Sequence, residues 1–302
     1  MKRRLATACL ALGPWLGAPH VRAQTPVEVF TYPRSESPSD SQYVYDYELL
    51  RLALEATVPT HGPFELRASA QAMNQAKAGE EILAGTRSVN VFARSTSAEI
   101  EMRFLPVRIP IDKGLISWRV FLVRADMEAK FAEVESLDQL RAYSVGSFTT
   151  WADTSILRAA GFKVVTGDSY EGLFRMLVDR KFDFFSRSAD EAYREWDERR
   201  ARLPEMRVEQ KLLLHFPTTR YFFVRRADEG QRLAERIEAG LETLIRTASF
   251  DNYFLRYKAV LINRAHLKTR RPFYIDNPFA SRETRALVKS RPELWFDVAK
   301  AR

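Results

Sequence analysis

The chain has 302 residues, of which 46% are hydrophobic, 28% charged and 12% aromatic. This is the composition of a folded globular protein, and it argues against a disordered chain, a collagen-like repeat or a coiled coil. The 47 basic and 39 acidic residues give a formal net charge of +8. A chain of this length typically folds as two domains, each with a hydrophobic core of its own.

Residues 1–23 have the features of a secretory signal peptide. A short basic start at residues 1–4 precedes a mostly apolar stretch at residues 5–18, and Val21 and Ala23 place small residues at the two positions that a signal peptidase inspects. Removal of this segment takes away four basic residues and no acidic ones, which leaves 43 basic and 39 acidic residues and a net charge of +4. The smaller charge weakens a nucleic-acid-binding interpretation.

Cys9 is the only cysteine and lies within this segment, so we expect an exported chain without disulfides or thiol chemistry. A lipid anchor on Cys9 is the alternative, but little apolar sequence precedes that residue. No later run reaches the roughly 18 apolar residues that span a bilayer. We therefore expect a periplasmic protein without a membrane span after cleavage near Ala23.

Apolar runs of strand length alternate with amphipathic helical stretches along the rest of the chain. In chain order we expect strands at 27–31, 88–93, 118–123, 143–146, 162–165, 182–185 and 220–224. We expect helices at 45–56, 150–160, 189–202 and 228–247, and two more that begin at 136 and at 168. This alternation predicts an α/β architecture with helices packed on a mostly parallel sheet.

Local signals mark several helix boundaries and a change near the C-terminus. Ser136 with Gln139 and Asp168 with Glu171 have the spacing of capping boxes. From Arg270 onward the alternation weakens and the sequence becomes rich in Pro and Arg, so we expect this tail to wrap the outside of the molecule.

Five segments occur in an order that resembles a known family. They are the first strand and helix, the segment 96–114, SLDQLR at 136–141 with the short strand after it, YEGLFRMLVDRKFDFF at 170–185, and the segment 221–254. Their order is similar to that of the family 3 extracellular solute-binding proteins, and the resemblance covers about residues 24–258.

The resemblance implies an α/β, type 2 periplasmic-binding-protein architecture with two lobes, two crossover strands and a central cleft. One lobe would combine residues 24–117 with 222–302, and the other would be residues 118–221. Ligands of such folds bind at the carboxyl ends of strands, where helix N-termini present free N–H groups. The implied function is capture of a small polar or anionic solute by hinge closure, for an inner-membrane ABC permease or a sensor, by a monomeric protein.

Two positions depart from the amino-acid binders of this family. Those proteins carry an Arg in a Thr-x-x-Arg-like segment that holds the ligand carboxylate, and here the segment 96–99 has Glu99 at that place. They also use an Asp after the strand that corresponds to 182–185, and residues 186–188 here are Ser, Arg and Ser. We therefore expect a solute other than a standard L-α-amino acid.

Loops that follow strands are the candidate walls of the cleft. The candidate ligand-binding residues are Tyr32, Arg34, Glu36, Arg94, Trp118, Thr149, Thr150, Trp151 and Arg187. Structural alternatives exist for several of them. Trp151 suits packing against the core as well as stacking on a ligand, and Arg34 with Glu36 suits a surface ion pair of little energy.

Motifs for metal or nucleotide chemistry are missing from the sequence. His61, His215 and His266 are not at metal-ligand spacing, and no phosphate-binding loop or dinucleotide fingerprint is found. We therefore expect no metal, no cofactor, no nucleic-acid partner and no enzyme activity. The alternatives are a dehydratase-like enzyme on the same scaffold, with Glu36 or Glu99 as the proton donor, and a degenerate cleft that binds nothing.

Overall fold

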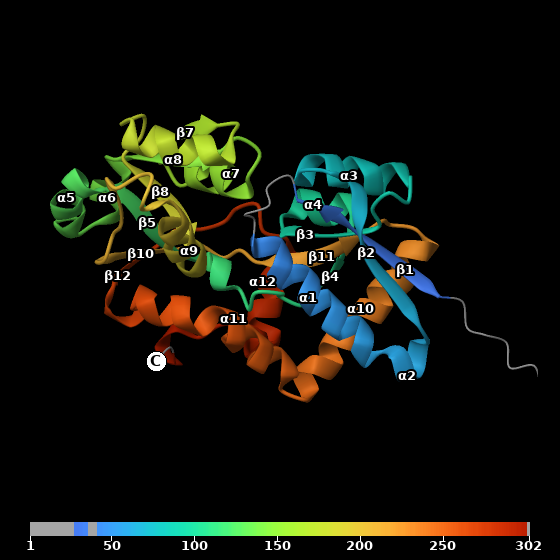
Figure 1. Cartoon of the computed structure of the whole chain (residues 1–302). Helices are drawn as coiled ribbons and strands as arrows, with labels where there is room; N and C mark the ends of the chain where they lie inside the picture. Colours follow the sequence, from blue (N-terminus) through green and yellow to red (C-terminus); the bar gives the residue numbers. More distant parts are fainter. Residues whose placement is uncertain (1–26, 36–40, 301–302) are drawn as a thin grey trace, which may run out of the picture.

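The strands assemble into three sheets, and Figure 1 shows that the structure forms two lobes side by side. A computed structural model describes residues 27–35 and 41–300. The predicted signal peptide with Cys9 and the candidate Glu36 lie outside the described residues. Within the described part, no helix has the length and apolar character to cross a membrane.

The first lobe forms around β11, whose five residues are all buried. β11 (Arg220–Val224) pairs antiparallel with β3 (Val91–Ser95) and β4 (Leu105–Val107), while β1 (Glu28–Arg34) pairs parallel with β2 (Phe64–Ala72). The helices of this lobe are α1 (Ser41–Ala56), α2 (Val58–His61), α3 (Gln75–Ala84), α4 (Ala98–Arg103) and α10 (Asp228–Arg246).

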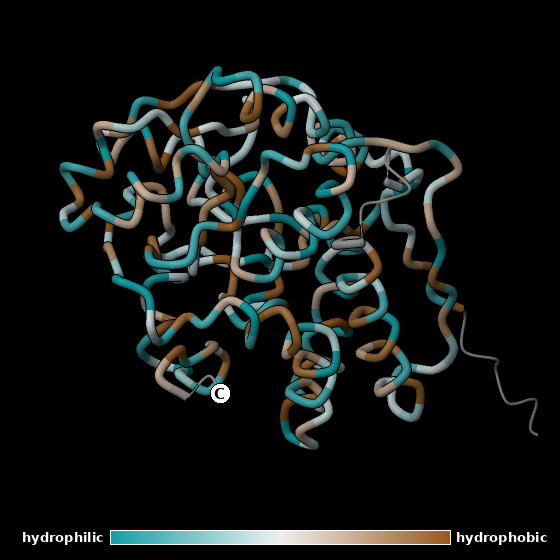
Figure 2. Tube along the Cα trace, turned by 60° about the vertical axis from the view of Figure 1, so that its left-hand side comes forward, coloured by the Kyte–Doolittle hydropathy of each residue, from teal (hydrophilic) through white to brown (hydrophobic). Residues whose placement is uncertain are grey.

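Successive side chains of β11 point to opposite faces of its sheet, so this strand contributes to both hydrophobic cores of the first lobe. Phe222 and Val224 belong to the core under α1 and α10, whereas Tyr221 and Phe223 belong to the smaller core under α3 and α4. α10 comes close to α1 because residue 240 is glycine, where a Cβ would lie 2.1 Å from a backbone oxygen of α1. Figure 2 shows apolar and polar residues alternating along the helices, as packing on a core requires.

β5 (Trp118–Arg124) is a central strand of the second lobe. Its sheet has the order β12-β10-β5-β8-β6-β7, and β9 also pairs with β5. The remaining elements of this lobe are β6 (Ser144–Phe148), β7 (Lys163–Gly167), β8 (Phe184–Ser188), β9 (Met206–Val208), β10 (Leu212–His215), β12 (Arg271–Tyr274), α5 (Glu128–Ala132), α6 (Leu137–Arg141), α7 (Ala152–Ala159), α8 (Tyr170–Val178) and α9 (Ala189–Arg199).

Two connectors join the lobes. The first connector, residues 108–117, leads from β4 to β5, and the second connector, residues 216–219, leads from β10 to β11. They run beside each other, because the Ser117 hydroxyl donates to the Thr218 carbonyl at 2.6 Å and accepts from the Thr218 N–H at 3.1 Å. A relative movement of the lobes therefore requires backbone rotation in these two segments.

The predicted α/β architecture is confirmed, but the prediction of a mostly parallel sheet is wrong, because β11 pairs antiparallel with β3 and β4, and β5 pairs antiparallel with β8, β9 and β10. Each predicted strand overlaps a strand of the structure, namely β1, β3, β5, β6, β7, β8 and β11. The capping box of Ser136 and Gln139 is present at the start of α6. The capping box of Asp168 and Glu171 is wrong, because Ser169 occupies the N-cap of α8 and its hydroxyl accepts from the Gly172 N–H.

The assignment of residues 222–302 to the first lobe is wrong for part of this segment. α11 (Ser249–Ala265) ends against α9, and β12 pairs in parallel with β10 at the edge of the second lobe's sheet. α12 (Arg282–Ser290) then returns to the first lobe. Arg271 and Pro272 hide the strand character of β12 in the sequence, although Phe273 and Ile275 are buried in a core of the second lobe.

Candidate functional site

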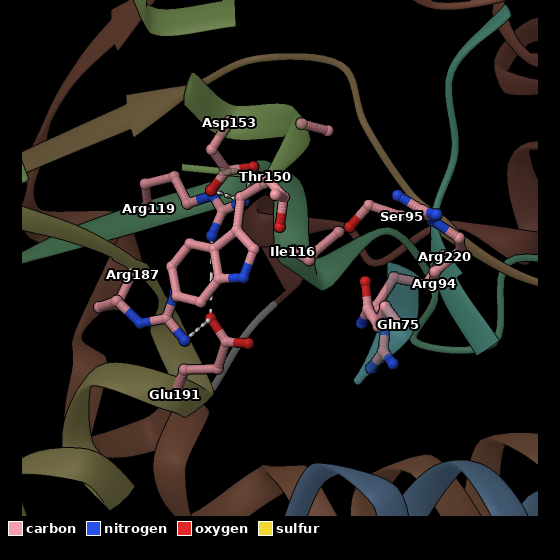
Figure 3. A pocket seen from close by; sticks show the side chains of 12 residues that line it. Gln75, Arg94, Ser95, Ile116, Arg119, Thr150, Asp153, Arg187, Glu191 and Arg220 are labelled. Carbon is pink, nitrogen blue, oxygen red and sulfur yellow. Dashed lines mark hydrogen bonds and ion pairs between the residues drawn. The ribbon is translucent and has the colours of Figure 1, made fainter. Parts of the chain in front are cut away.

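A cavity lies between the two lobes, with a volume of about 520 Å³ including the open space at its mouth. Its walls come from β3, α3 and β11 of the first lobe, from the first connector, and from β5, α7, β8 and α9 of the second lobe. The lining residues are Gln75, Arg94, Ser95, Ile116, Arg119, Thr150, Trp151, Ala152, Asp153, Arg187, Glu191 and Arg220 (Figure 3). A wider groove at the mouth shares several of these residues and adds Thr149 and Glu99.

The second-lobe wall is a network of paired charges. Arg119, only 1% exposed, contacts both carboxylate oxygens of Asp153 at 2.9 and 2.8 Å. Arg187 lies 3.1 Å from the Glu191 carboxylate and also binds the fully buried Glu195 at 2.6–3.0 Å. Both carboxylates that line the cavity are therefore already engaged by arginines of the same lobe, as Figure 3 shows.

Burial and charge act differently on the two carboxyl groups of this wall. Burial raises the pKa of Asp153, and the nearby Arg119 and Arg187 only partly offset this effect. Burial would also raise the pKa of Glu191, but Arg187 and Arg119 outweigh it and hold that pKa well below its usual range. Glu191 is therefore a stable negative charge between two guanidinium groups.

Arg94 is the charge of the first-lobe wall that the protein leaves unpaired. Its guanidinium has no ion pair among the described residues, and its Nε is buried without a hydrogen-bond partner there. Burial lowers the pKa of this guanidinium, and the charge of Arg103 adds to the effect. Arg220 on the same wall is instead paired with the buried Asp46. Figure 3 places Arg94 across the cavity from Asp153 and Glu191.

Trp151 takes part in both the core and the cavity. Its ring is nearly parallel to that of Phe185, with centroids 6.1 Å apart, and stacks on Phe148 at 5.6 Å. The Arg187 guanidinium lies 4.5 Å from the ring centroid. The ring of Trp151 therefore packs against the core and also lines the cavity, and its stacking on a ligand stays a prediction. Thr150, next to it, lines the cavity and is exposed.

Three other candidates do not line the cavity. Tyr32 stacks on Tyr47 with ring centroids 4.0 Å apart, and Arg34 is exposed at the end of β1. Trp118 packs on His215 with ring centroids 4.2 Å apart, so its ring contacts a side chain of the second lobe. The structure thus brings Arg94, Thr150, Trp151 and Arg187 together and places Thr149 at the mouth.

Comparisons with solved structures agree with this architecture. An ancestral arginine-binding protein bound to arginine is 14% identical, with a TM-score of 0.56 over 78% of this chain and 99% of that protein. A histidine kinase sensor domain similar to periplasmic binding proteins is 18% identical, with a TM-score of 0.54 over 78% of this chain and 98% of that domain. A probable amino-acid ABC transporter extracellular-binding protein from Bacillus subtilis is 14% identical, with a TM-score of 0.56 over 77% of this chain and 98% of that protein.

The chain has the periplasmic-binding-protein fold. No family model and no curated protein matches the sequence, so this likeness is one of fold.

Within this periplasmic-binding-protein fold, the two departures from amino-acid binders have clear positions. Glu99 is exposed on α4 and lies 3.8 Å from Arg103, so it faces solvent at the mouth of the groove. Ser186, Arg187 and Ser188 are buried in β8. Among residues 27–35 and 41–300, no group of three or more His, Cys, Asp or Glu side chains is placed to hold a metal ion.

Four charged residues of the cavity are not among the candidates that the sequence predicted. Arg119, Asp153, Glu191 and Arg220 all line it. A signal was available for two of them, since Arg119 and Arg220 stand within or at the start of apolar strand runs. A charged residue in a buried strand needs a partner, and that partner is often at a functional site.

Proposed function

We propose that this protein is a periplasmic solute-binding protein, which captures a small anionic solute in the cavity between its lobes by hinge closure. The solute would be handed to an inner-membrane ABC permease or reported to a sensor. The observation that supports this proposal best is the guanidinium of Arg94, which lines the cavity without an ion-pair partner among the described residues and whose Nε is buried without a hydrogen bond there. A buried donor without an acceptor is costly, and an anionic ligand that accepts from this guanidinium would reduce that cost.

The paired carboxylates of the opposite wall argue against a standard L-α-amino acid. The ammonium group of such a ligand requires an acceptor, and the acidic candidates on the cavity wall are Asp153 and Glu191. Arg119 engages both oxygens of Asp153, and Arg187 engages Glu191. An ammonium would have to compete with these arginines, whereas a solute that is only anionic or polar needs no such exchange.

Two further observations support delivery outside the cytoplasm. Residues 1–23 have the pattern of a signal peptide, and the structural neighbours include an extracellular-binding protein of an ABC transporter and a sensor domain of a histidine kinase. These neighbours suggest the two destinations that we propose for the solute.

A thermal-shift screen of the protein against organic acids, amino acids, polyamines and sugars tests the proposed function. A solute at 100 times its dissociation constant stabilises the folded state by about 2.7 kcal/mol, which raises the melting temperature by several degrees. We expect organic acids to raise it and amino acids and polyamines not to. A response restricted to amino acids would contradict the proposed solute class, and consumption of the solute over time would show an enzyme.

The proposal predicts a specific role for Arg94. Arg94→Ala should weaken binding of the solute found in the screen by about 10- to 100-fold, because a hydrogen bond to a charged group contributes about 1.5–3 kcal/mol. Arg94→Lys should bind with intermediate affinity, since it keeps the charge but not the fork of donors. Calorimetric titration measures both affinities.

Arg67→Ala is the matched control for Arg94→Ala, because Arg67 is exposed on β2 of the same lobe and pairs only with groups away from the cavity. Equal affinities for Arg94→Ala and Arg67→Ala would remove Arg94 from the binding site.

A further inference from the structure

The C-terminal tail, residues 266–300, begins in the second lobe. Arg270 is buried, and its guanidinium donates to the carbonyls of Glu209 at 2.7 Å and Leu212 at 3.0 Å. β12 follows and pairs with β10 along its full length. Figure 1 shows this orange-to-red segment passing from β12 in one lobe to α12 at the junction of the lobes.

The tail then passes the second connector and docks on the first lobe. The Asn277 side chain donates to the Pro217 carbonyl of that connector at 2.8 Å. The hydroxyls of Ser281 and Thr284 donate to the buried carboxylate of Glu101 in α4, at 2.9 and 2.8 Å. The start of α12 is thus anchored to the first lobe by buried hydrogen bonds.

After α12 the tail crosses the first connector. The ring of Trp295 covers Gly114, where a Cβ would lie 2.4 Å from a ring carbon. The N–H of Phe296 donates to the Lys113 carbonyl at 2.6 Å, and the Lys113 ammonium donates to the Glu293 carbonyl at 2.9 Å. Gly114 has φ +65, a conformation that glycine adopts without strain and that suits a hinge.

The tail ends on the second lobe again. Phe296 and Val298 pack against a core of that lobe, and the ring of Phe296 lies 5.9 Å from that of Phe254 in α11. The last turn, Val298–Lys300, contacts the short turn Leu267–Thr269 at which the tail began. The tail has therefore crossed between the lobes twice, once beside each connector.

We propose that this tail is a strap that holds the hinge. A hinge movement needs backbone rotation in the connectors. The strap holds Lys113 and Gly114 of the first connector, and it also binds both lobes. The lobes are then held in one arrangement until the segment around Trp295 leaves the first connector. The strap thereby opposes opening and closing of the cavity. The holding of the hinge does not rest on the proposed function, whereas its use in solute exchange does.

A distance measurement between the lobes tests the strap without any ligand. Glu80→Cys in α3 and Ser155→Cys in α7 place two spin labels at exposed positions on opposite sides of the groove, in the full chain with Cys9→Ser. Double electron–electron resonance then gives the distribution of distances between the labels. We expect a single narrow population in this parent, because the strap is intact.

Trp295→Ala removes the ring that covers Gly114. We expect this variant to show a second population at a different interlobe distance, which holds more than the roughly 10% of molecules that a minor state reaches. Trp196→Ala is the matched control, since Trp196 lies on α9 away from both connectors and its ring is also partly buried. If Trp295→Ala does not fold, Trp295→Leu takes its place in the measurement, because leucine keeps apolar packing on the first lobe. It should show the same second population.

Two outcomes would overturn the strap. One is a broad or double distance distribution in the parent, which would mean that the hinge moves freely with the tail in place. The other is a distribution in the folded Trp295 variants that equals the parent's. Because no solute is present, a failure here leaves the solute-binding proposal intact, and a failed solute screen does not affect this test.

Discussion

Arginine does two different things in this protein, and burial and pairing decide which. Arg119, Arg187 and Arg220 are at most 5% exposed, and each lies against a buried carboxylate. Buried charges of this kind are tolerated only with partners, so these residues hold the lobes' own structure together. Arg94 has no carboxylate within ion-pair distance among the described residues, and for this reason we propose that its charge binds the solute.

Arg187 is therefore expected to act on stability more than on binding. Arg187→Ala leaves Glu195 buried without its guanidinium, so we expect a loss of about 3–5 kcal/mol in the free energy of unfolding. Arg264→Ala, which removes an exposed pair with Asp197, should cost no more than about 1 kcal/mol. Urea denaturation measures both values. A loss for Arg187→Ala as small as that for Arg264→Ala would show that the buried network is not structural.

His215 should make stability depend on pH. Burial beside Trp118 lowers the pKa of His215 from 6.5 to about 4, so between these values the unfolded state takes up a proton that the folded state does not. Stability is therefore lost as the pH falls from 7 to 5, by about 1–2 kcal/mol from this group.

Comparison of variants isolates the contribution of His215. Denaturation at pH 7 and pH 5 should show a smaller stability change in His215→Gln than in the parent, while the exposed His61→Gln should behave like the parent. The same change with pH in His215→Gln and in the parent would rule out this role for His215.

At the scale of elements, β6 and its glycine position the helix that lines the cavity. β6 lies between β7 and β8 in parallel register, and Trp151, the N-cap of α7, follows it after two residues. Residue 146 has no side chain because the ring of Phe182 fills that space, where a Cβ would lie 2.2 Å from a ring carbon. Close packing at this point keeps α7 beside β8 and brings Trp151 over Arg187.

Gly146→Ala should overpack this contact and destabilise the protein by about 1–3 kcal/mol. Phe182→Leu creates room for the added methyl group, so the double variant should be more stable than the sum of the two single effects predicts. Thermal or urea denaturation of the four proteins in this cycle gives the coupling. Strictly additive effects would show that Phe182 is not the group that excludes a side chain at residue 146.

Elements with a strong apolar period were predictable, and short or exposed elements were not. β11 is buried along its whole length and stands out as a largely apolar run, whereas β8 was placed only by its first two residues, Phe184 and Phe185, because Ser, Arg and Ser follow them in the buried strand. β2 was missed because it lies at the edge of its sheet and most of its residues are exposed. β10 and β12 were missed because each has only four residues, and β12 begins with Arg and Pro.

At the scale of the whole molecule, the tail changes the expected mechanics of the fold. Two connectors alone would form an open hinge, as the sequence resemblance implied. Here α11 also bridges the lobes, since Tyr253 bonds to α1 and Lys258 pairs with Asp190 of α9. Together with the connectors and the strap, the chain therefore passes between the lobes at several separate places. The interlobe distance measurement therefore tests a property of the whole molecule that no single lobe contains.

The sequence alone determined the architecture and a good part of the cavity wall. Strand and helix periods are local, so Arg94, Trp151 and Arg187 could each be assigned to the end of a buried strand or to the loop after it, although Arg94 and Arg187 lie within β3 and β8 of two separate sheets. The pairing of charges is not local. Arg119 meets Asp153 across 34 residues, and Arg220 meets Asp46 across 174. Only the tertiary structure decided which arginine stays unpaired and where the tail crosses the hinge. Both depend on contacts between segments that are far apart in the chain, and the sequence of one segment does not indicate which other segment it contacts.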